Sequence, residues 1–295
     1  MVAHSCGVLK KRFAKTRSLH PSDAVQGFGI SQQAFCNAKM VFVYTKTLLA
    51  TAMNAFLNCK KFFQEAATVT AQTMQIENRP CRIYGEAHAE YLLLQMTGEH
   101  EVQSMDDEVA AIAQSAHQFL FAAIPVENWN DALSPWEAPA VWGKQGFGGK
   151  AGDTLRFLTE QVIPTLEQQF NLPENVKIIL GGYSLAGLFA LWASTQANLF
   201  CGIAVASPSV WFPGWMEFEQ QHPMQAQHIY LSLGDKEEHT KNAVMAAVGD
   251  NIRTLHSRLI ERGADCALEW NSGGHFKNAD LRTARAFRWA MEEKR

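Results

Sequence analysis

The sequence predicts an α/β protein with a mostly parallel, doubly wound sheet that carries helices on both faces. Three observations support this prediction. Segments with strand and helix patterns alternate along the chain from Met74 onward. Several strand segments are apolar throughout, as expected for strands covered on both faces. One of them runs directly into a helix through a turn of small residues, GGYSLAG at 181–187.

The first elements after Met74 are expected to be two strands, a helix and a third strand. The helix at 104–118 would begin with Ser104 as N-cap, and three acidic residues in its first turn suit the helix dipole. A long helix follows at 153–170, and Pro164 should kink it. The strands are predicted at 81–85, 90–98 and 119–126, with a loop rich in Trp, Pro and Gly at 127–152.

The second half continues the alternation and places chemistry-bearing residues just beyond its strands. In sheets of this kind, ligands bind outside the carboxyl ends of the strands. The loops that follow each strand are therefore the places to search for a functional site. Strands are predicted at 176–182, 202–207, 228–234 and 266–271, and helices at 185–195, at 240–262 and from about Ala279.

Charge divides the chain into two parts. Residues 1–73 hold nine of the 26 Lys and Arg residues but two of the 29 Asp and Glu residues. We therefore expect a basic extension at 1–73, poorly ordered or marginally helical, and a folded α/β domain at 74–295. The apolar stretch at 40–57 contains Lys46 and is barely long enough to cross a bilayer, so no membrane association is expected.

Composition also limits the partners and cofactors. A net charge of −3 gives no reason to expect nucleic acid as a partner. The six cysteines form no CxxC pair and are widely spaced, which favours reduced thiols in a cytoplasmic protein. The ten histidines show no HExxH pattern, so we expect neither a metal nor an organic cofactor. The sequence does not predict the oligomeric state.

Ser184 is the candidate nucleophile. A strand that turns straight into a helix holds its turning residue in a strained conformation, and only small residues fit two positions away on either side. Gly182 and Ala186 occupy those positions. The alternative is an ordinary turn serine that caps the following helix. We favour the nucleophile, with the N–H of Leu185 directed toward an oxyanion formed at the serine.

A nucleophilic serine needs a base in reach and an acid that orients the base. His275 lies beyond strand 266–271, in the Gly-rich loop SGGHFKN, and is the candidate base; the alternative is a surface histidine in a turn. Asp235, Glu237 and Glu238 all follow strand 228–234, and spacing alone does not choose among them. A second oxyanion donor is expected after the strand at 90–98, where we select the N–H of Glu99.

Four stretches together resemble the putative esterase family of α/β-hydrolases, which includes enterochelin-esterase-like enzymes, S-formylglutathione hydrolases and feruloyl esterases. They are GGYSLAG (181–187), SPSVW (207–211), SLGDKEEHT (232–240) and GGHF (273–276). The resemblance covers about residues 90–280 and implies an α/β-hydrolase fold. It implies catalytic roles for Ser184 and His275, and it favours Glu237 as the acid. It also places Ser207, Ser209 and Trp211 beside the substrate.

Two departures from the family pattern bear on the site. Ala186 stands where the family usually has glycine, and Thr97-Gly98 replaces the common His-Gly or Asp-Gly pair. The loop at 127–149 contains three tryptophans. It forms either a wall of the substrate pocket or a segment packed onto the domain. We include Trp129 in the predicted pocket, together with Tyr183 beside the nucleophile.

The function predicted from these residues is hydrolysis of a small-molecule carboxylic ester through an acyl-enzyme on Ser184. The same groups would serve a thioester or an amide. Two alternatives are a non-catalytic binding module on a hydrolase scaffold and an acyltransferase that passes the acyl group to an alcohol.

Overall fold

The computed structural model describes residues 71–98, 105–115 and 117–292. By its internal contacts the chain divides into the units Met1–Glu65 and Ala66–Arg295, and every described residue belongs to the second. The first strand begins at Ala71, inside the region assigned above to the extension. The division at residue 73 and the character of the extension remain predictions.

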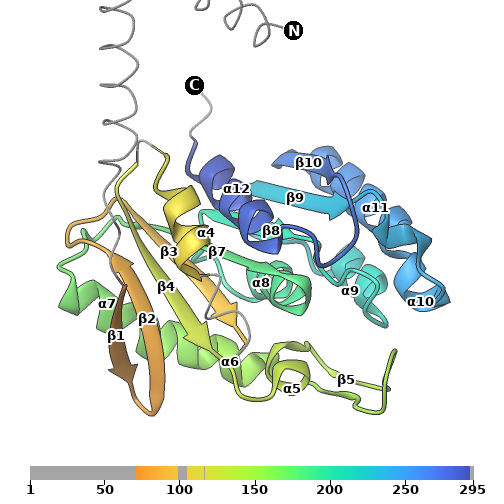
Figure 1. Ribbon diagram of the computed structural model, residues 1–295, viewed down its shortest axis with the longest axis horizontal. Coiled ribbons are helices and arrows are strands. Elements are labelled where there is room, and N and C mark those ends of the chain that lie inside the picture. Colours follow the sequence, from red (N-terminus) through yellow and green to blue (C-terminus); the bar gives the residue numbers. More distant parts are fainter. Residues whose placement is uncertain (1–70, 99–104, 116, 293–295) are drawn as a thin grey trace, which may run out of the picture. The chain divides into compact units, whose positions relative to one another are not determined.

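An eight-stranded sheet forms the centre of the described unit (Figure 1). Its strands lie in the order β1-β2-β4-β3-β7-β8-β9-β10. The pairs β1–β2 and β2–β4 are antiparallel, and all other pairs are parallel. The strands are β1 (Ala71–Ile76), β2 (Arg79–Gly85), β3 (Tyr91–Thr97), β4 (Phe119–Pro125), β7 (Lys177–Tyr183), β8 (Gly202–Ala206), β9 (His228–Gly234) and β10 (Asp265–Asn271).

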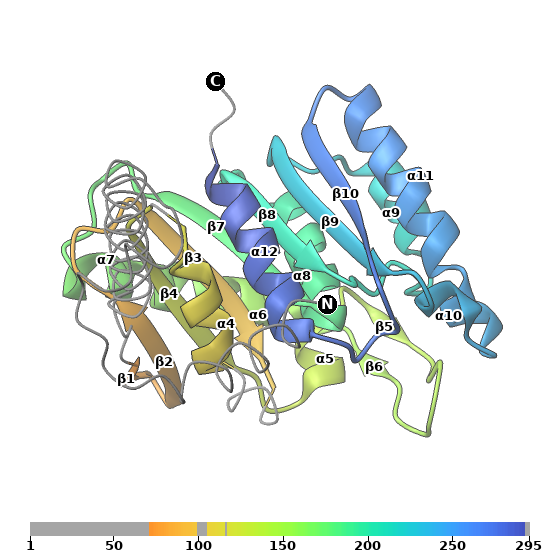
Figure 2. The same cartoon turned by 45° about the horizontal axis from the view of Figure 1, so that its top comes forward.

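Helices cover both faces of this sheet and create two apolar cores. Helices α4 and α12 lie together on one face, in front of the strands in Figure 2, and pack on Leu93, Phe121 and Ile179. The larger core on the other face contains α6, α7, α8, α9 and α11. The helices are α4 (Met105–Ile112), α5 (Trp129–Leu133), α6 (Ala151–Phe157), α7 (Ile163–Gln169), α8 (Ser184–Gln196), α9 (Trp215–Gln221), α10 (Ala243–Ala246), α11 (Val248–Glu261) and α12 (Ala279–Met291).

The predicted fold class is confirmed, whereas several elements differ from prediction. The helix expected at 104–118 ends at Ile112, and the one expected at 240–262 is split. Its first part, α10, starts at Ala243 because the Asn242 side chain accepts the N–H groups of Val244 and Met245 and caps the helix. Helix α9 and strand β1 were not predicted; α9 is seven residues long and follows a Pro-Gly pair.

Pro164 acts through a π-helical turn rather than a simple kink. This turn, Leu158–Val162, lies between α6 and α7, and Pro164 is near the start of α7. Proline has no N–H to donate, and its ring clashes with the carbonyl four residues earlier. A wider turn in front of proline accommodates both effects.

The loop predicted at 127–152 contains a short helix and a small hairpin. Helix α5 is followed by the paired strands β5 (Glu137–Ala138) and β6 (Phe147–Gly148).

No helix of the described residues is both long and apolar enough to cross a membrane. The cytoplasmic location predicted above remains a prediction.

Candidate active site

Ser184 is the first residue of α8 and directly follows β7. Its φ of 57° lies in the left-handed region, which non-glycine residues seldom adopt, and this is the strained turn that the sequence predicts. A Cβ placed on Gly182 would lie 2.8 Å from Ala186, so the turn is closed too tightly for a side chain there. The strand–turn–helix geometry therefore directs the serine hydroxyl away from the sheet.

The carboxyl ends of β7 to β10 bring four loops to one edge of the sheet. The register pairs Tyr183 with Ala206, Ala206 with Ser232, and Gly234 with Asn271. Residues that follow these strands therefore meet above the same edge. The segment after β9 forms a short 3₁₀ turn, Glu237–His239, and the segment after β10 reaches His275.

Ser184, His275 and Glu237 form a continuous hydrogen-bonded line. The Nε2 of His275 lies 3.0 Å from Ser184 Oγ, and its Nδ1 lies 2.7 Å from Glu237 Oε2. Glu237 is buried, with 5% of its side chain exposed, whereas His275 is about a quarter exposed. The imidazole thus connects a buried carboxylate to a hydroxyl at the sheet edge, an arrangement that can move a proton from the serine.

The surroundings of Glu237 favour its ionised form. Burial by itself would raise the pKa of this carboxyl. Hydrogen bonds from His275, from the Ser207 hydroxyl at 2.6 Å and from the Gly234 N–H at 2.7 Å act in the opposite direction. Together they hold the pKa of Glu237 below its ordinary value, so a negative charge faces the imidazole at neutral pH.

The two other candidate acids are engaged elsewhere. Asp235 accepts the N–H of Gly273 at 2.7 Å and so supports the backbone that leads to His275. Glu238 accepts two hydrogen bonds from Arg253, each at 2.9 Å. Glu237 is therefore the carboxylate that the fold places beside the imidazole.

Of the two predicted oxyanion donors, the structure describes Leu185 but not Glu99. Leu185 is the second residue of α8, so its N–H is at a helix N-terminus next to Ser184, as expected. Glu99 lies outside the described residues, and its role remains a prediction. The residue before it, Gly98, lies close to Trp129, because a Cβ on Gly98 would be 3.5 Å from that ring.

Of the residues predicted to line the pocket, Tyr183 and Ser209 contact members of the triad, and Trp211 packs elsewhere. The Tyr183 ring lies against the His275 ring, and its hydroxyl donates to the His275 carbonyl. The Ser209 N–H donates to the Ser184 carbonyl at 2.9 Å. Trp211 is half-buried and packs on Phe147 of the hairpin. Their contact with a substrate remains a prediction.

The three tryptophans of the loop have different roles. Trp136 packs on Phe212 and Phe218, and its indole N–H donates to the Pro213 carbonyl at 3.0 Å, so it fixes the loop to the domain. Trp129 lies half-buried beside Gly98. Trp142 is 64% exposed. Trp136 thus packs the loop onto the domain, and the role of the loop as a pocket wall remains a prediction.

Sequence reasoning missed Arg282, whose guanidinium also reaches Glu237. Arg282 lies on α12, and its side chain is 4% exposed. The signal was present in the sequence, because residues 282, 283, 286, 287 and 290 share the buried face of that helix. An arginine within an apolar helix face indicates a buried partner of opposite charge.

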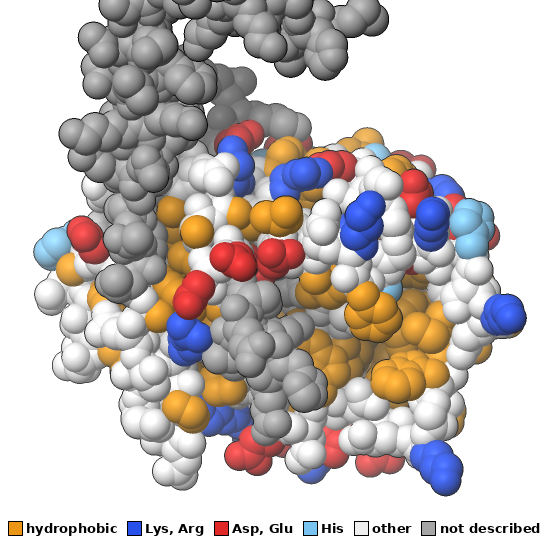
Figure 3. Space-filling model, in the orientation of Figure 1, with side chains coloured by type: hydrophobic (Ala, Val, Ile, Leu, Met, Phe, Trp, Pro, Cys, Tyr) orange, Lys and Arg blue, Asp and Glu red, His pale blue; other side chains and the backbone are white. Residues whose placement is uncertain are grey.

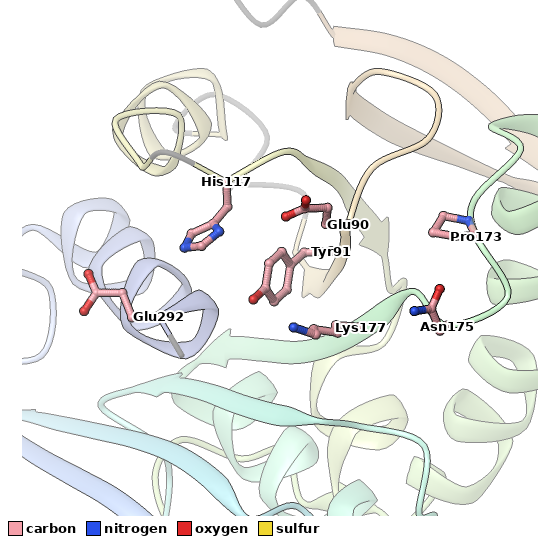
Figure 4. Close-up of a pocket in the computed structure, with 7 residues that line it drawn as sticks. All are labelled: Glu90, Tyr91, His117, Pro173, Asn175, Lys177 and Glu292. Carbon is pink, nitrogen blue, oxygen red and sulfur yellow. The ribbon is translucent and has the colours of Figure 1, made fainter. Parts of the chain in front are cut away.

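A separate cavity of about 610 Å³ lies near the amino ends of β3 and β7 (Figure 4). In it, the Tyr91 ring contacts the edge of the His117 ring and the amino group of Lys177. Tyr91 and Lys177 start their strands, whereas Ser184 follows the end of β7. Among the described residues, no cluster of His, Cys, Asp and Glu is arranged to hold a metal ion.

A family model described as Putative esterase matches residues 102–277 of the chain. None of the curated proteins compared matches the sequence.

Several solved structures share the fold at low sequence identity. An IroE-like serine hydrolase from Shewanella oneidensis has a TM-score of 0.60 and 17% identity, over 74% of this chain and 79% of that one. The siderophore hydrolase EstA from Aspergillus nidulans has a TM-score of 0.54 and 18% identity, over 74% and 92%. The enterobactin esterase of Shigella flexneri, solved in the presence of enterobactin, has a TM-score of 0.57 and 15% identity, over 75% and 57%.

Proposed function

The chain belongs to the Putative esterase family and is an ester-hydrolysing enzyme, and on this basis we propose that Ser184, His275 and Glu237 form its catalytic triad. The observation that carries the proposal is the unbroken line of hydrogen bonds from Glu237 through His275 to Ser184, at 2.7 and 3.0 Å. Each member follows a different strand of the sheet, in the chain order serine, acid, histidine, as in other α/β-hydrolases.

The proposed reaction passes through an acyl-enzyme. Ser184 Oγ attacks the acyl carbon while His275 Nε2 takes its proton, and the carbonyl π electrons move onto oxygen. The tetrahedral intermediate collapses, and the leaving alcohol receives that proton from His275. Water then attacks the acyl-enzyme with His275 as base, and the carboxylic acid leaves. Glu237 holds the imidazole in place and stabilises its protonated form. The mechanism calls for no cofactor.

Backbone N–H groups are proposed to stabilise the anionic intermediate. The N–H of Leu185 is one donor, since it lies at the start of α8 beside the nucleophile. The N–H of Glu99 remains the predicted second donor.

We propose small-molecule esters with an aromatic or other apolar group as substrates. Figure 3 shows a hollow walled by hydrophobic side chains in the region of β5, α9 and α10. Phe276, next to His275, is 94% exposed, and its ring meets the imidazole edge-on at 5.2 Å between centroids. An aromatic side chain left in solvent beside a catalytic base can shield the reacting bond once an apolar substrate covers it.

Labelling with a fluorophosphonate, together with assays on aromatic and acetyl esters, tests the proposal. The wild type should be labelled and active, and Ser184→Ala should lose both properties. Ser257→Ala, which changes an exposed serine on α11, is the matched control and should behave as wild type. Labelling and turnover that survive in Ser184→Ala would overturn the assignment.

The same assay separates hydrolysis from acyl transfer. An acyltransferase would convert the acyl-enzyme to a new ester when a simple alcohol is added, whereas a hydrolase should still release mainly the acid.

Phe276→Ala should lower kcat/KM for the aromatic ester more than for the acetyl ester. An equal loss on both would argue against an apolar substrate contact at this position.

A further inference from the structure

Arg282 makes an unusual set of contacts for a buried side chain. Its Nη1 lies 3.1 Å from Glu237 Oε1, 3.1 Å from Ser207 Oγ and 3.3 Å from the Tyr183 hydroxyl. Its Nη2 donates to the Gly274 carbonyl at 3.3 Å. Each of these partners lies at the carboxyl end of a different strand: β7, β8, β9 and β10. One guanidinium therefore joins the three chain segments that carry the proposed triad and the segment of Ser207.

We propose that Arg282 is a positioning residue for this esterase, one that holds Glu237 in the orientation that His275 needs and compensates part of its charge. The inference rests on the proposed function. It adds a fourth residue, from α12, to the groups on which hydrolysis depends.

The hydrogen bonds of Glu237 show how the positioning works. Oε1 accepts from Ser207, from the Gly234 N–H and from Arg282, so three donors fix this oxygen. Oε2 is left to His275. Rotation of the carboxylate would break the bonds to Oε1, and the oxygen that faces the imidazole therefore stays in place.

Charge balance gives Arg282 a second effect on the reaction. A carboxylate at this depth is costly without a partner, and the Arg282–Glu237 pair is neutral as a unit. With the guanidinium in place, His275 faces a carboxylate whose charge is partly compensated. Without it, the full negative charge would hold a proton on the imidazole more strongly and keep the base protonated to higher pH.

The other ionisable groups near Glu237 do not replace Arg282. Asp235 is bonded to the Gly273 N–H, and Glu238 is paired with Arg253. The Tyr183 hydroxyl donates to the His275 carbonyl, and burial raises the pKa of that phenol. Among the described residues, the ionisable side chains paired with Glu237 are thus His275 and Arg282.

Ser207 supports the same network from a strained backbone. Its φ is 47°, again in the left-handed region, and its hydroxyl both donates to Glu237 and accepts from Arg282. The resemblance to known esterases had placed Ser207 beside the substrate. Its hydroxyl is instead buried in contact with the carboxylate and guanidinium.

The experiment compares pH profiles of kcat/KM on a chromogenic ester for full-length wild type, Arg282→Gln and Arg282→Lys. Arg282→Gln should lower kcat/KM about 100-fold, the order of loss for a triad displaced by about 1 Å. It should also move the acidic limb of the profile upward by about one pH unit, because an uncompensated charge acts on the base. Arg282→Lys keeps the positive charge but loses the planar guanidinium that contacts several partners at once. It should keep the limb in place and recover part of the rate.

A second buried ion pair supplies the matched control. Arg258 reaches the buried Glu219 of α9 from α11, a pair with no member in the triad. Arg258→Gln should lower the thermal stability yet leave the position of the acidic limb unchanged.

A purely structural role for Arg282 would give a different result. In that case Arg282→Gln would lower the melting temperature with the acidic limb at its wild-type pH, and the proposal would be overturned. If Arg282→Gln does not fold, Arg282→Lys still decides. If the acidic limb of the Arg282→Lys profile moves, the proposed role of the charge is wrong. If its kcat/KM equals that of wild type, the proposed role of the guanidinium geometry is wrong. Failure of the proposed function would appear separately, as a wild type that fluorophosphonate does not label at Ser184.

Discussion

Replacement of Gly182 by alanine tests the tight turn on which the nucleophile depends. The new Cβ would lie 2.8 Å from both the carbonyl carbon and the Cβ of Ala186, and 2.9 Å from its carbonyl oxygen. Contacts below 3.0 Å essentially never occur, and ordinary contact begins near 3.4 Å. The neighbour is helix backbone and cannot rotate away. The first turn of α8 must therefore move by several tenths of an ångström, together with Ser184.

That displacement sets the expected magnitude. If misplacement by about 1 Å costs about 100-fold in rate, a shift of about half that size predicts about a tenfold loss in kcat/KM. Overpacking should also lower the free energy of unfolding by about 1–3 kcal/mol. Steady-state kinetics on a chromogenic ester and urea unfolding measure the two effects.

Gly202→Ala is the matched control on the next strand. A Cβ there meets its nearest neighbours at 3.5 Å or more, so this variant should keep the wild-type rate. The double variant Gly182→Ala/Ala186→Gly should recover only part of the loss, because the backbone atoms of residue 186 remain in the way. A folded Gly182→Ala enzyme with wild-type kcat/KM would refute the reasoning.

Two further predictions concern stability. Glu219 is fully buried and paired with Arg258 and Arg262, so Glu219→Ala should cost about 3–5 kcal/mol in urea unfolding, whereas the exposed Glu217→Ala should stay within about 0.5 kcal/mol of wild type. Because the folded pKa of Glu237 is lowered, its carboxylate stabilises the fold above the ordinary value of 4.5, and this contribution disappears as pH falls through the folded pKa. The stability difference between wild type and Glu237→Gln should therefore shrink steadily in unfolding experiments below pH 4.5; a difference that is constant with pH would contradict this assignment.

The parts of the structure that local patterns specify could be predicted from the sequence. Apolar runs identified seven of the eight sheet strands, and the small residues around Ser184 indicated its turn. The choice of Glu237 as the acid depended on the family resemblance, because three carboxylates lie within four consecutive residues. Only the folded loops separate them, by directing Asp235 to Gly273 and Glu238 to Arg253.

Features that depend on distant contacts escaped prediction. Arg282 is 45 residues from Glu237, and the sequence around Arg282 does not identify Glu237 as its partner. Strand β1 has a mostly exposed pattern, so it lacks the apolar signal of the central strands. Its place in the sheet comes from pairing with β2.

The hairpin segment between α5 and α6 is attached to the rest of the enzyme at defined points. The Trp136 indole bonds to the Pro213 carbonyl, and the Asn242 amide bonds to the Val141 carbonyl at 2.7 Å. The triad and Arg282 all lie outside this segment. The segment is therefore attached independently of the residues proposed to carry out the chemistry. We therefore expect that residues 142–146, Trp142 included, can be replaced while the two anchors and the proposed triad stay in place.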